Sequence, residues 1–372
     1  MFISITSFKR NKEQKKKYKD NIMSSVAQLF KNNPVNHDRI IPLDFTNTKT
    51  LPDSHVWSKP ELEPEPMTRP IPVISISSPE KVLLRHACEE WGVFHITDHG
   101  VPLSLLHNVE CQMKRLFSLP MHRKILAVRS PDESTGYGVV RISMFYDKLM
   151  WSEGFSVMDS SLRRHATLIW PDDHAEFCNV IEEYQKEMAN LSHRLVSMVM
   201  GSLGLTHKEL RWLVPNITGS RTDSSQSFLQ LNSYPVCPDP DLAMGLAPHT
   251  DSSLLTILYQ GNIPGLEIQN LQAEKSRWIG VEPVEGGLVV IMGDLSHIIS
   301  NGRFKSTMHR AVVNKTHHRV SAAYFSGPPK NLQIGPLTAD TDHPPLYRRL
   351  TWEEYLAAKA THFNEALSLF RC

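Results

Sequence analysis

Two side chains of metal-binding type lie close together in residues 245–258, GLAPHTDSSLLTIL: His249 and Asp251. In an extended strand, side chains at positions i and i+2 point to the same face, so these two can bind one ion. A third candidate ligand, His309 in FKSTMHRAVVN, has to come from another strand. Two imidazoles and one carboxylate on one side of an ion form the facial triad of non-haem iron(II) oxygenases, in which the opposite positions stay open.

Zinc is the alternative metal, because zinc hydrolases also use His and carboxylate ligands with a water in the remaining position. A second pair at the same spacing, Arg319 and Ser321, separates the two hypotheses. Its guanidinium fork and hydroxyl can bind the carboxylate of a co-substrate. Asn232 and Tyr234, in the strand-like run FLQLNSYP, repeat the spacing and add polar groups to the same cavity. A hydrolase needs no such carboxylate-binding groups, so the residues favour an oxygenase.

The order and spacing of these residues resemble the plant 2-oxoglutarate and iron(II)-dependent dioxygenases, over residues 71–370. The resemblance implies Fe(II) as cofactor, 2-oxoglutarate and O2 as co-substrates, and ascorbate in support. It implies that the catalytic metal ligands are His249, Asp251 and His309. It also implies that 2-oxoglutarate is bound near the metal by Asn232 and at its distal carboxylate by Tyr234, Arg319 and Ser321.

Longer segments resemble one branch of that family, the gibberellin 3-oxidases. They are LMWSEGF (149–155), AMGLAPHTDSSLLTILYQ (243–260), HIISNGRFKSTMHRAVVN (297–314) and KATHFNEALSLFR (359–371). The branch implies hydroxylation of a small molecule, a gibberellin precursor, at the 3-beta position, giving bioactive gibberellin, succinate and carbon dioxide. The alternatives are a sister gibberellin 20- or 2-oxidase, a flavonoid dioxygenase and, from a different class, a catalytically silent hormone-binding protein.

The same strand alternation predicts the cavity wall. Ala323 and Phe325 follow on the face of the Arg/Ser pair, and Phe228 and Gln230 precede on the face of the Asn/Tyr pair. We expect an apolar cavity with aromatic edges and take Phe325 as a substrate contact.

A substrate carboxylate needs a cationic side chain in that cavity. Near the LMWSEGF segment the chain offers Arg141 and Lys148. The sequence does not rank one above the other.

Most of the eighteen histidines must have structural or surface positions. His297 is expected to be packed or hydrogen-bonded, and His95 and His99 to be structural. The adjacent pair His317 and His318 would face opposite ways on a strand, so we assign it to an exposed turn, NKTHH.

Charge and cysteine usage limit the function classes. The net charge is +1, and the basic residues gather in residues 1–21, so they indicate a basic tail and not a nucleic-acid-binding face. The five cysteines are odd in number and lack CxxC spacing, which favours a reducing compartment. No run of eighteen apolar residues predicts a membrane span. We expect a cytoplasmic protein, with the nucleus as an alternative and a plastid disfavoured, and no nucleic-acid or membrane partner.

Changes in composition divide the chain into four segments: a basic tail and Pro-rich linker (1–70), an N-terminal helical and strand dioxygenase region (71–215), an iron and 2-oxoglutarate jelly-roll core (216–335) and a C-terminal helix (336–372). From residue 228, short β-rich runs separated by turns predict a sandwich or barrel. One of these runs is HRAVVN (309–314). The resemblance makes this a mainly β fold with flanking helices, the double-stranded β-helix or distorted jelly roll.

Helix signals flank these strands. After the strand IPVISI (71–76), a helix with Ser78 as its cap and Pro79 at its first position should end at Gly92. A second helix should cover 103–119. The longest should cover 175–203, where apolar residues recur at three- and four-residue steps and predict packing on the barrel. Residues 351–370 predict one further helix that closes the substrate side or packs under the barrel.

Overall fold

The structure is a computed structural model that describes residues 39–57, 70–158, 161–205, 227–270, 277–337 and 344–372. The basic tail, most of the Pro-rich linker and the predicted boundary at residues 215 and 216 lie outside the described residues. The four-segment division of the chain therefore stays a prediction.

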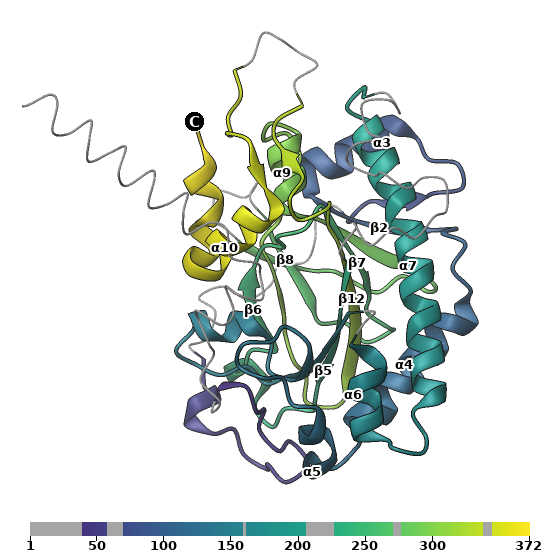
Figure 1. Ribbon diagram of the computed structural model, residues 1–372, viewed down its shortest axis with the longest axis vertical. Helices are drawn as coiled ribbons and strands as arrows, with labels where there is room; N and C mark the ends of the chain where they lie inside the picture. Colours follow the sequence, from purple (N-terminus) through teal and green to yellow (C-terminus); the bar gives the residue numbers. More distant parts are fainter. Residues whose placement is uncertain (1–38, 58–69, 159–160, 206–226, 271–276, 338–343) are drawn as a thin grey trace, which may run out of the picture.

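The fold is built on a sheet of eight strands (Figure 1). In chain order they are β1 (Val73–Ser75), β2 (Val93–Thr97), β3 (Gly136–Gly138), β4 (Glu153–Val157), β5 (Ser227–Tyr234), β7 (Leu255–Tyr259), β10 (Leu288–Met292) and β12 (Arg319–Ser326). Their order across the sheet is β1-β2-β10-β7-β12-β5-β4-β3. Only β1 and β2 pair in parallel. Strands from the N-terminal region and from the jelly-roll core therefore share one sheet.

A second sheet of four antiparallel strands completes the jelly roll expected from the sequence. Its order is β6 (Leu246–His249), β11 (His309–Ala311), β8 (Leu266–Asn270) and β9 (Arg277–Gly280). The predicted strand HRAVVN was too long, because β11 ends at Ala311 and its register against β6 shifts after His309. A small sheet pairs β13 (Gln333–Ile334) with β14 (Leu350–Thr351).

Two helices cover the outer face of the large sheet (Figure 1). They are α7 (Ala175–Gly201) and α4 (Leu103–Phe117), which contact each other and both contact β12. The predicted apolar stripe of the long helix is confirmed, since all of its members are buried: Phe177, Ile181, Tyr184, Met188, Leu191, Leu195 and Val199.

The helix predicted after β1 ends where expected but begins later. It comprises α3 (Lys81–His86) and one π-helical turn (Ala87–Trp91), so the predicted first turn at Pro79 was wrong. Gly92 ends it with a φ of 66°, a left-handed conformation that favours glycine. A Cβ there would lie 2.2 Å from the carbonyl oxygen of Lys305, so glycine also lets the loop before β11 approach closely.

The C-terminal segment is two helices and not the single one predicted. A capping box at Thr351 starts α10 (Trp352–His362). Phe363 then has a φ of 47°, which ends the α-helix, and a 3-10 helix, η7 (Phe363–Phe370), follows. Figure 1 shows this yellow segment on the opposite side of the strands from α7.

Short helical elements complete the described chain: η2 (Asp53–His55), α5 (Met121–Lys124), η4 (Ile125–Ala127), η5 (Arg141–Phe145), α6 (Leu162–Ile169), η6 (Pro240–Leu242) and α9 (Asp294–Ile299). None of the helices in the described part combines the length and the apolar character that crossing a bilayer requires.

Candidate active site

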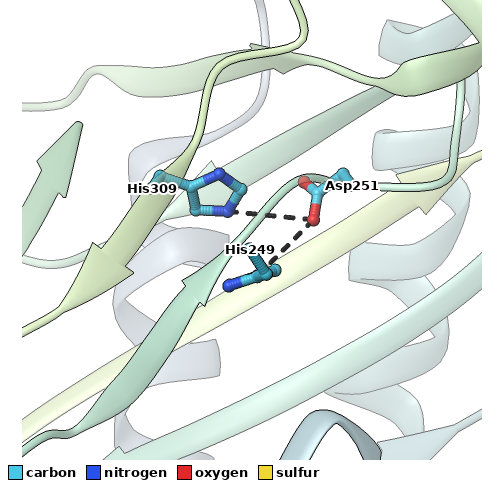
Figure 2. Close-up of side chains that lie close together, drawn as sticks. All are labelled: His249, Asp251 and His309. Atoms are coloured by element: carbon cyan, nitrogen blue, oxygen red, sulfur yellow. Dashed lines mark ion pairs between the residues drawn. The ribbon is translucent and has the colours of Figure 1, made fainter. Parts of the chain in front are cut away.

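The smaller sheet brings the three candidate metal ligands together. His249 ends β6 and His309 begins β11, and the two are direct partners in the antiparallel pairing. Asp251 follows in the loop after β6, and its Oδ1 lies 3.7 Å from Nε2 of His249 and 3.8 Å from Nε2 of His309 (Figure 2). One ligand atom from each residue falls within 4.8 Å of the others, and all three residues are buried. These distances suit three ligands around one ion.

Backbone hydrogen bonds orient both imidazoles. Nδ1 of His249 lies 2.8 Å from the carbonyl oxygen of Ala247, and Nδ1 of His309 lies 3.1 Å from that of Thr307. A carbonyl oxygen only accepts, so each Nδ1 carries the hydrogen and each Nε2 presents a lone pair. Burial and the neighbouring His309 hold the pKa of His249 well below its usual value, which keeps this imidazole neutral.

Thr256 fixes the carboxylate of Asp251. Its hydroxyl, on β7, donates to Oδ2, which leaves Oδ1 facing the two imidazoles. Sequence reasoning missed this residue, although its place in the predicted strand LLTILY was an available signal. Two buried imidazoles and one carboxylate are a donor set that fits Fe(II).

The expected co-substrate residues lie on two neighbouring strands of the large sheet. In the register of β12 against β5, Arg319 faces Tyr234 and Ser321 faces Asn232. Nδ2 of Asn232 lies 3.5 Å from Oγ of Ser321, and the guanidinium carbon of Arg319 lies 5.0 Å from the centre of the Tyr234 ring. All four side chains are buried.

Neutral oxygens hold the guanidinium of Arg319. Its Nε donates to the carbonyl oxygen of Ile263 at 3.2 Å, and Nη2 donates to Oε1 of Gln260 at 3.4 Å. Burial lowers the pKa of Arg319 and raises that of Tyr234. Gln260 is a second residue that sequence reasoning missed. Because its partners carry no charge, the guanidinium keeps its positive charge for an anionic ligand.

A cavity of about 360 Å³ joins the two groups of residues. Its lining includes the predicted wall residues Phe228, Gln230, Ala323 and Phe325. The rings of Phe228 and Phe325 are 5.9 Å apart. The cavity therefore has the aromatic edge that strand alternation predicted.

The C-terminal segment forms another part of the wall. Trp352 and Leu356 of α10 line the cavity, as does Phe363 at the break. The Phe363 ring stacks on Phe145 of η5 at 4.6 Å and 11°. Of the two positions expected for this segment, closing the substrate side or packing under the barrel, the contacts with the cavity favour the first.

Two expectations about individual side chains were wrong. Lys148 does not line the cavity; its Nζ donates to the carbonyl oxygen of Asp53 at an exposed position. His318 is half-buried and not part of an exposed turn, because its Nε2 lies 2.8 Å from the hydroxyl of Ser233. Arg141 does line the cavity.

Two further histidines have the expected structural contacts. His297 lies 2.6 Å from the carbonyl oxygen of Phe304 and 2.9 Å from the hydroxyl of Tyr347. His99 lies 2.8 Å from the carbonyl oxygen of Gly286.

Comparisons with known proteins agree with this geometry. Residues 225–328 match the model of the 2OG-Fe(II) oxygenase superfamily, and residues 71–173 match the non-haem dioxygenase in morphine synthesis N-terminal family. Gibberellin 3-beta-dioxygenase 3 of Arabidopsis thaliana is 86% identical over 94% of this chain and 100% of its own length. Gibberellin 3-beta-dioxygenase 1 of Pisum sativum is 44% identical over 94% of each chain.

Solved structures show the same fold. A crystal structure of JOX2 in complex with 2OG, Fe and JA has a TM-score of 0.74 and 28% identity, covering 88% of this chain and 96% of that one. A crystal structure of the dioxygenase for auxin oxidation in rice has a TM-score of 0.66 and 25% identity, covering 81% and 100%. The chain therefore belongs to the plant 2OG-Fe(II) oxygenases, enzymes that use Fe(II), 2-oxoglutarate and O2.

Proposed function

We propose that this enzyme hydroxylates gibberellin precursors at the 3-beta position and so produces bioactive gibberellin, with succinate and carbon dioxide as co-products. The observation that carries the proposal is the 86% identity to gibberellin 3-beta-dioxygenase 3 across 94% of the chain. The aromatic-edged cavity supports it, because a tetracyclic diterpenoid presents a rigid hydrocarbon body to such a wall.

In this proposal, His249, Asp251 and His309 hold the iron. Bound Fe(II), together with 2-oxoglutarate and O2, supplies the oxidant for an unactivated carbon–hydrogen bond. The protein's own contribution is orientation. Hydrogen bonds to the carbonyl oxygens of Ala247 and Thr307 orient the two imidazoles, and the hydroxyl of Thr256 orients the carboxylate of Asp251.

The co-substrate residues are assigned by charge and position. Arg319 and Ser321, with Tyr234, bind the distal carboxylate of 2-oxoglutarate, and Asn232 lies toward its other end. The support is that Arg319 is a buried cation with neutral partners, on a strand whose next inward residue is Ser321. A bidentate guanidinium suits a carboxylate.

Product identification tests the proposed function. The protein is loaded with Fe(II) under anaerobic conditions and then given O2, 2-oxoglutarate and a panel of gibberellins and flavanones. We expect substrate-dependent formation of succinate. Gibberellin substrates that already lack carbon 20 should be hydroxylated at the 3-beta position, and mass spectrometry identifies the product. Oxidation at carbon 20 or a 2-beta-hydroxyl would assign the protein to a sister branch.

The same experiment decides between the remaining classes. Activity on flavanones alone would make the protein a flavonoid dioxygenase. Binding of gibberellin without succinate release would make it a catalytically silent hormone-binding protein. Reactions without O2 or without 2-oxoglutarate are the controls.

We also propose a cytoplasmic location, with the nucleus as the alternative, and no nucleic-acid or membrane partner. All five cysteines are free, which supports a reducing compartment.

A further inference from the structure

The cavity carries an excess of positive charge. Among its lining residues in the described chain, Asp251 is the one carboxylate, whereas several are cationic. Some of the cations have an acidic neighbour outside the lining. Arg310 donates to Glu267 at 2.6 Å, and Lys359 lies 2.9 Å from Asp294. This lining suits a ligand that carries an anionic group.

Arg129 is a buried cation in this cavity with an unused donor. It follows η4, it is 2% exposed, and it lines the cavity. Its Nη2 donates to the carbonyl oxygen of Val139 at 2.7 Å, but its buried Nε has no partner among the described residues. A buried donor without an acceptor costs stability, so such a group indicates a ligand acceptor.

The backbone that carries Arg129 is held firmly. Its N–H donates to the carbonyl oxygen of Tyr137 at 2.9 Å. Gly136 has a φ of 123°, and a Cβ there would lie 2.9 Å from Cα of Arg129. Close approach of these two segments fixes where the side chain enters the cavity, which favours a positioned binding group over a mobile one.

Arg141, at the start of η5, supplies a second guanidinium to the same cavity. Its Nη1 donates to the carbonyl oxygen of Glu133 at 3.0 Å, while the Glu133 carboxylate pairs at 3.3 Å with Arg164 at the surface. Burial lowers the pKa of both Arg129 and Arg141 to about 10, and Arg141 contributes to the shift at Arg129. Both guanidinium groups therefore stay charged at neutral pH.

The residues proposed to hold the iron and the co-substrate do not include Arg129 or Arg141. In the proposed function, Asp251 would help to hold Fe(II), and Arg319 would bind the distal carboxylate of 2-oxoglutarate. We propose that Arg129 and Arg141 form a carboxylate-binding site for the substrate, with the hydrocarbon body lying against the phenylalanines of the wall. This inference rests on the proposed function, since it names the group by which a gibberellin acid is recognised.

Such a site would determine specificity. A guanidinium fork binds a carboxylate through charge-assisted hydrogen bonds, which a methyl ester cannot replace. A neutral ligand of similar size that offers no acceptor there would leave the buried Nε of Arg129 without a hydrogen bond. The enzyme should therefore select acids over their esters and disfavour flavanones, which carry no carboxylate.

The test combines a variant with a modified substrate. Arg141→Met and Arg129→Lys are compared with the wild type on a gibberellin acid and on its methyl ester, with Fe(II) and 2-oxoglutarate present. We expect Arg141→Met to raise KM for the acid by roughly 10- to 100-fold, the ratio for losing a charge-assisted bond. The variant should leave KM for the ester and for 2-oxoglutarate nearly unchanged. Arg129→Lys keeps the charge, so its KM for the acid should lie between that of the wild type and that of Arg141→Met. An equal loss on acid and ester would overturn the proposal.

An anaerobic binding experiment separates this proposal from the proposed function. The holoenzyme is titrated by calorimetry with a diterpenoid monocarboxylic acid and with its methyl ester, so hydroxylation is not required. Preferential binding of the acid that Arg141→Met abolishes supports the carboxylate site even if no gibberellin is hydroxylated. Equal binding of acid and ester by the wild type would refute it. Arg303→Gln, which removes an exposed arginine paired with Glu89, is the matched control. It should change neither the acid-to-ester ratio of KM nor that of binding affinity.

Discussion

At the scale of single residues, each proposed ligand has a partner that points it inward. Each of the two histidines donates a hydrogen bond from one ring nitrogen to a backbone carbonyl, and one oxygen of Asp251 accepts a hydrogen bond from Thr256. This arrangement leaves one free atom per residue, and the three free atoms converge (Figure 2). Removing one ligand should therefore affect metal binding far more than folding.

His309→Ala leaves two protein ligands for the metal. We expect a loss of iron affinity greater than the roughly 10- to 100-fold that follows removal of a ligand-orienting partner. Substrate-dependent succinate release should disappear, while the circular dichroism spectrum stays that of the wild type. Iron content after gel filtration and succinate formation are the measurements. His317→Ala, at an exposed position, is the control. Wild-type turnover in the His309 variant would remove His309 from the site.

Arg319→Lys keeps the charge but loses the planar fork. A charge-assisted hydrogen bond contributes about 1.5–3 kcal/mol, so the apparent KM for 2-oxoglutarate should rise by roughly ten-fold or more. Iron affinity should stay nearly constant, because the guanidinium of Arg319 donates to Ile263 and Gln260. Steady-state kinetics at varied 2-oxoglutarate measures the change, with Arg303→Lys as control. An unchanged KM would contradict the assigned role.

At the scale of elements, one buried carboxylate joins the segments that meet at the site. Asp294, at the start of α9, accepts from Lys359 and Tyr355 of α10, from Thr250 and from Ser306. Thr250 lies between His249 and Asp251 in the chain, and Ser306 lies in the loop before β11. The C-terminal helix is thus tied to the loops that carry the site.

Lys359→Met should loosen this connection. The variant loses the hydrogen bonds of Nζ to Asp294 at 2.9 Å and to Thr250 at 2.6 Å. We expect the free energy of unfolding in urea to fall by about 1.5–3 kcal/mol. Hydrogen exchange should become faster in α10 and in the loop after β6, and not in α7. Lys315→Met, in an exposed turn, is the control. An unchanged hydrogen-exchange rate in α10 would show that the helix is held by its packing in the cavity wall and not by the bonds of Lys359.

At the scale of the whole molecule, the core and the site occupy opposite faces of the large sheet. Leu231 of β5 and Ala322 of β12 point into the core beneath α7 and α4, whereas Asn232 and Ser321 line the cavity. The main apolar core therefore contains none of the proposed site residues. Stability of the metal-free protein should depend on the core and on buried titratable groups.

Acid should destabilise the metal-free protein. Burial lowers the pKa of His55, His95 and His165 from the ordinary value of 6.5. Below about pH 6.5 the unfolded chain gains protons that the folded chain resists, so the free energy of unfolding is highest above that pH and falls toward the lowered values. Each histidine contributes at most about 1.4 kcal/mol per pH unit.

Urea unfolding near pH 7.5 and near pH 5.5 measures this loss. His165→Gln should reduce the difference between the two pH values, and His317→Ala should leave it unchanged. A stability that rises on acidification would contradict the direction of the shifts.

The amino-acid sequence predicts the features that depend on local spacing. Strand alternation predicted that Arg319 and Ser321 share a face, and three- to four-residue periodicity predicted α7 with its buried stripe. The pair His249 and Asp251 does meet at one site, but Asp251 lies in the loop after β6 and not in the predicted strand. The family and the fold followed from the order of these motifs and are confirmed. Intervals of two, three and four residues carry such information because the backbone geometry of strands and helices is fixed.

Contacts between distant segments become visible in the folded structure and not in the sequence. The fold paired His309 with His249 and gave Asp251 its Thr256 partner. It also placed Arg129 in the cavity and broke the C-terminal helix at Phe363, where stacking on Phe145 forms the wall. No local pattern encodes these contacts, because each one depends on the register and approach of elements far apart along the chain.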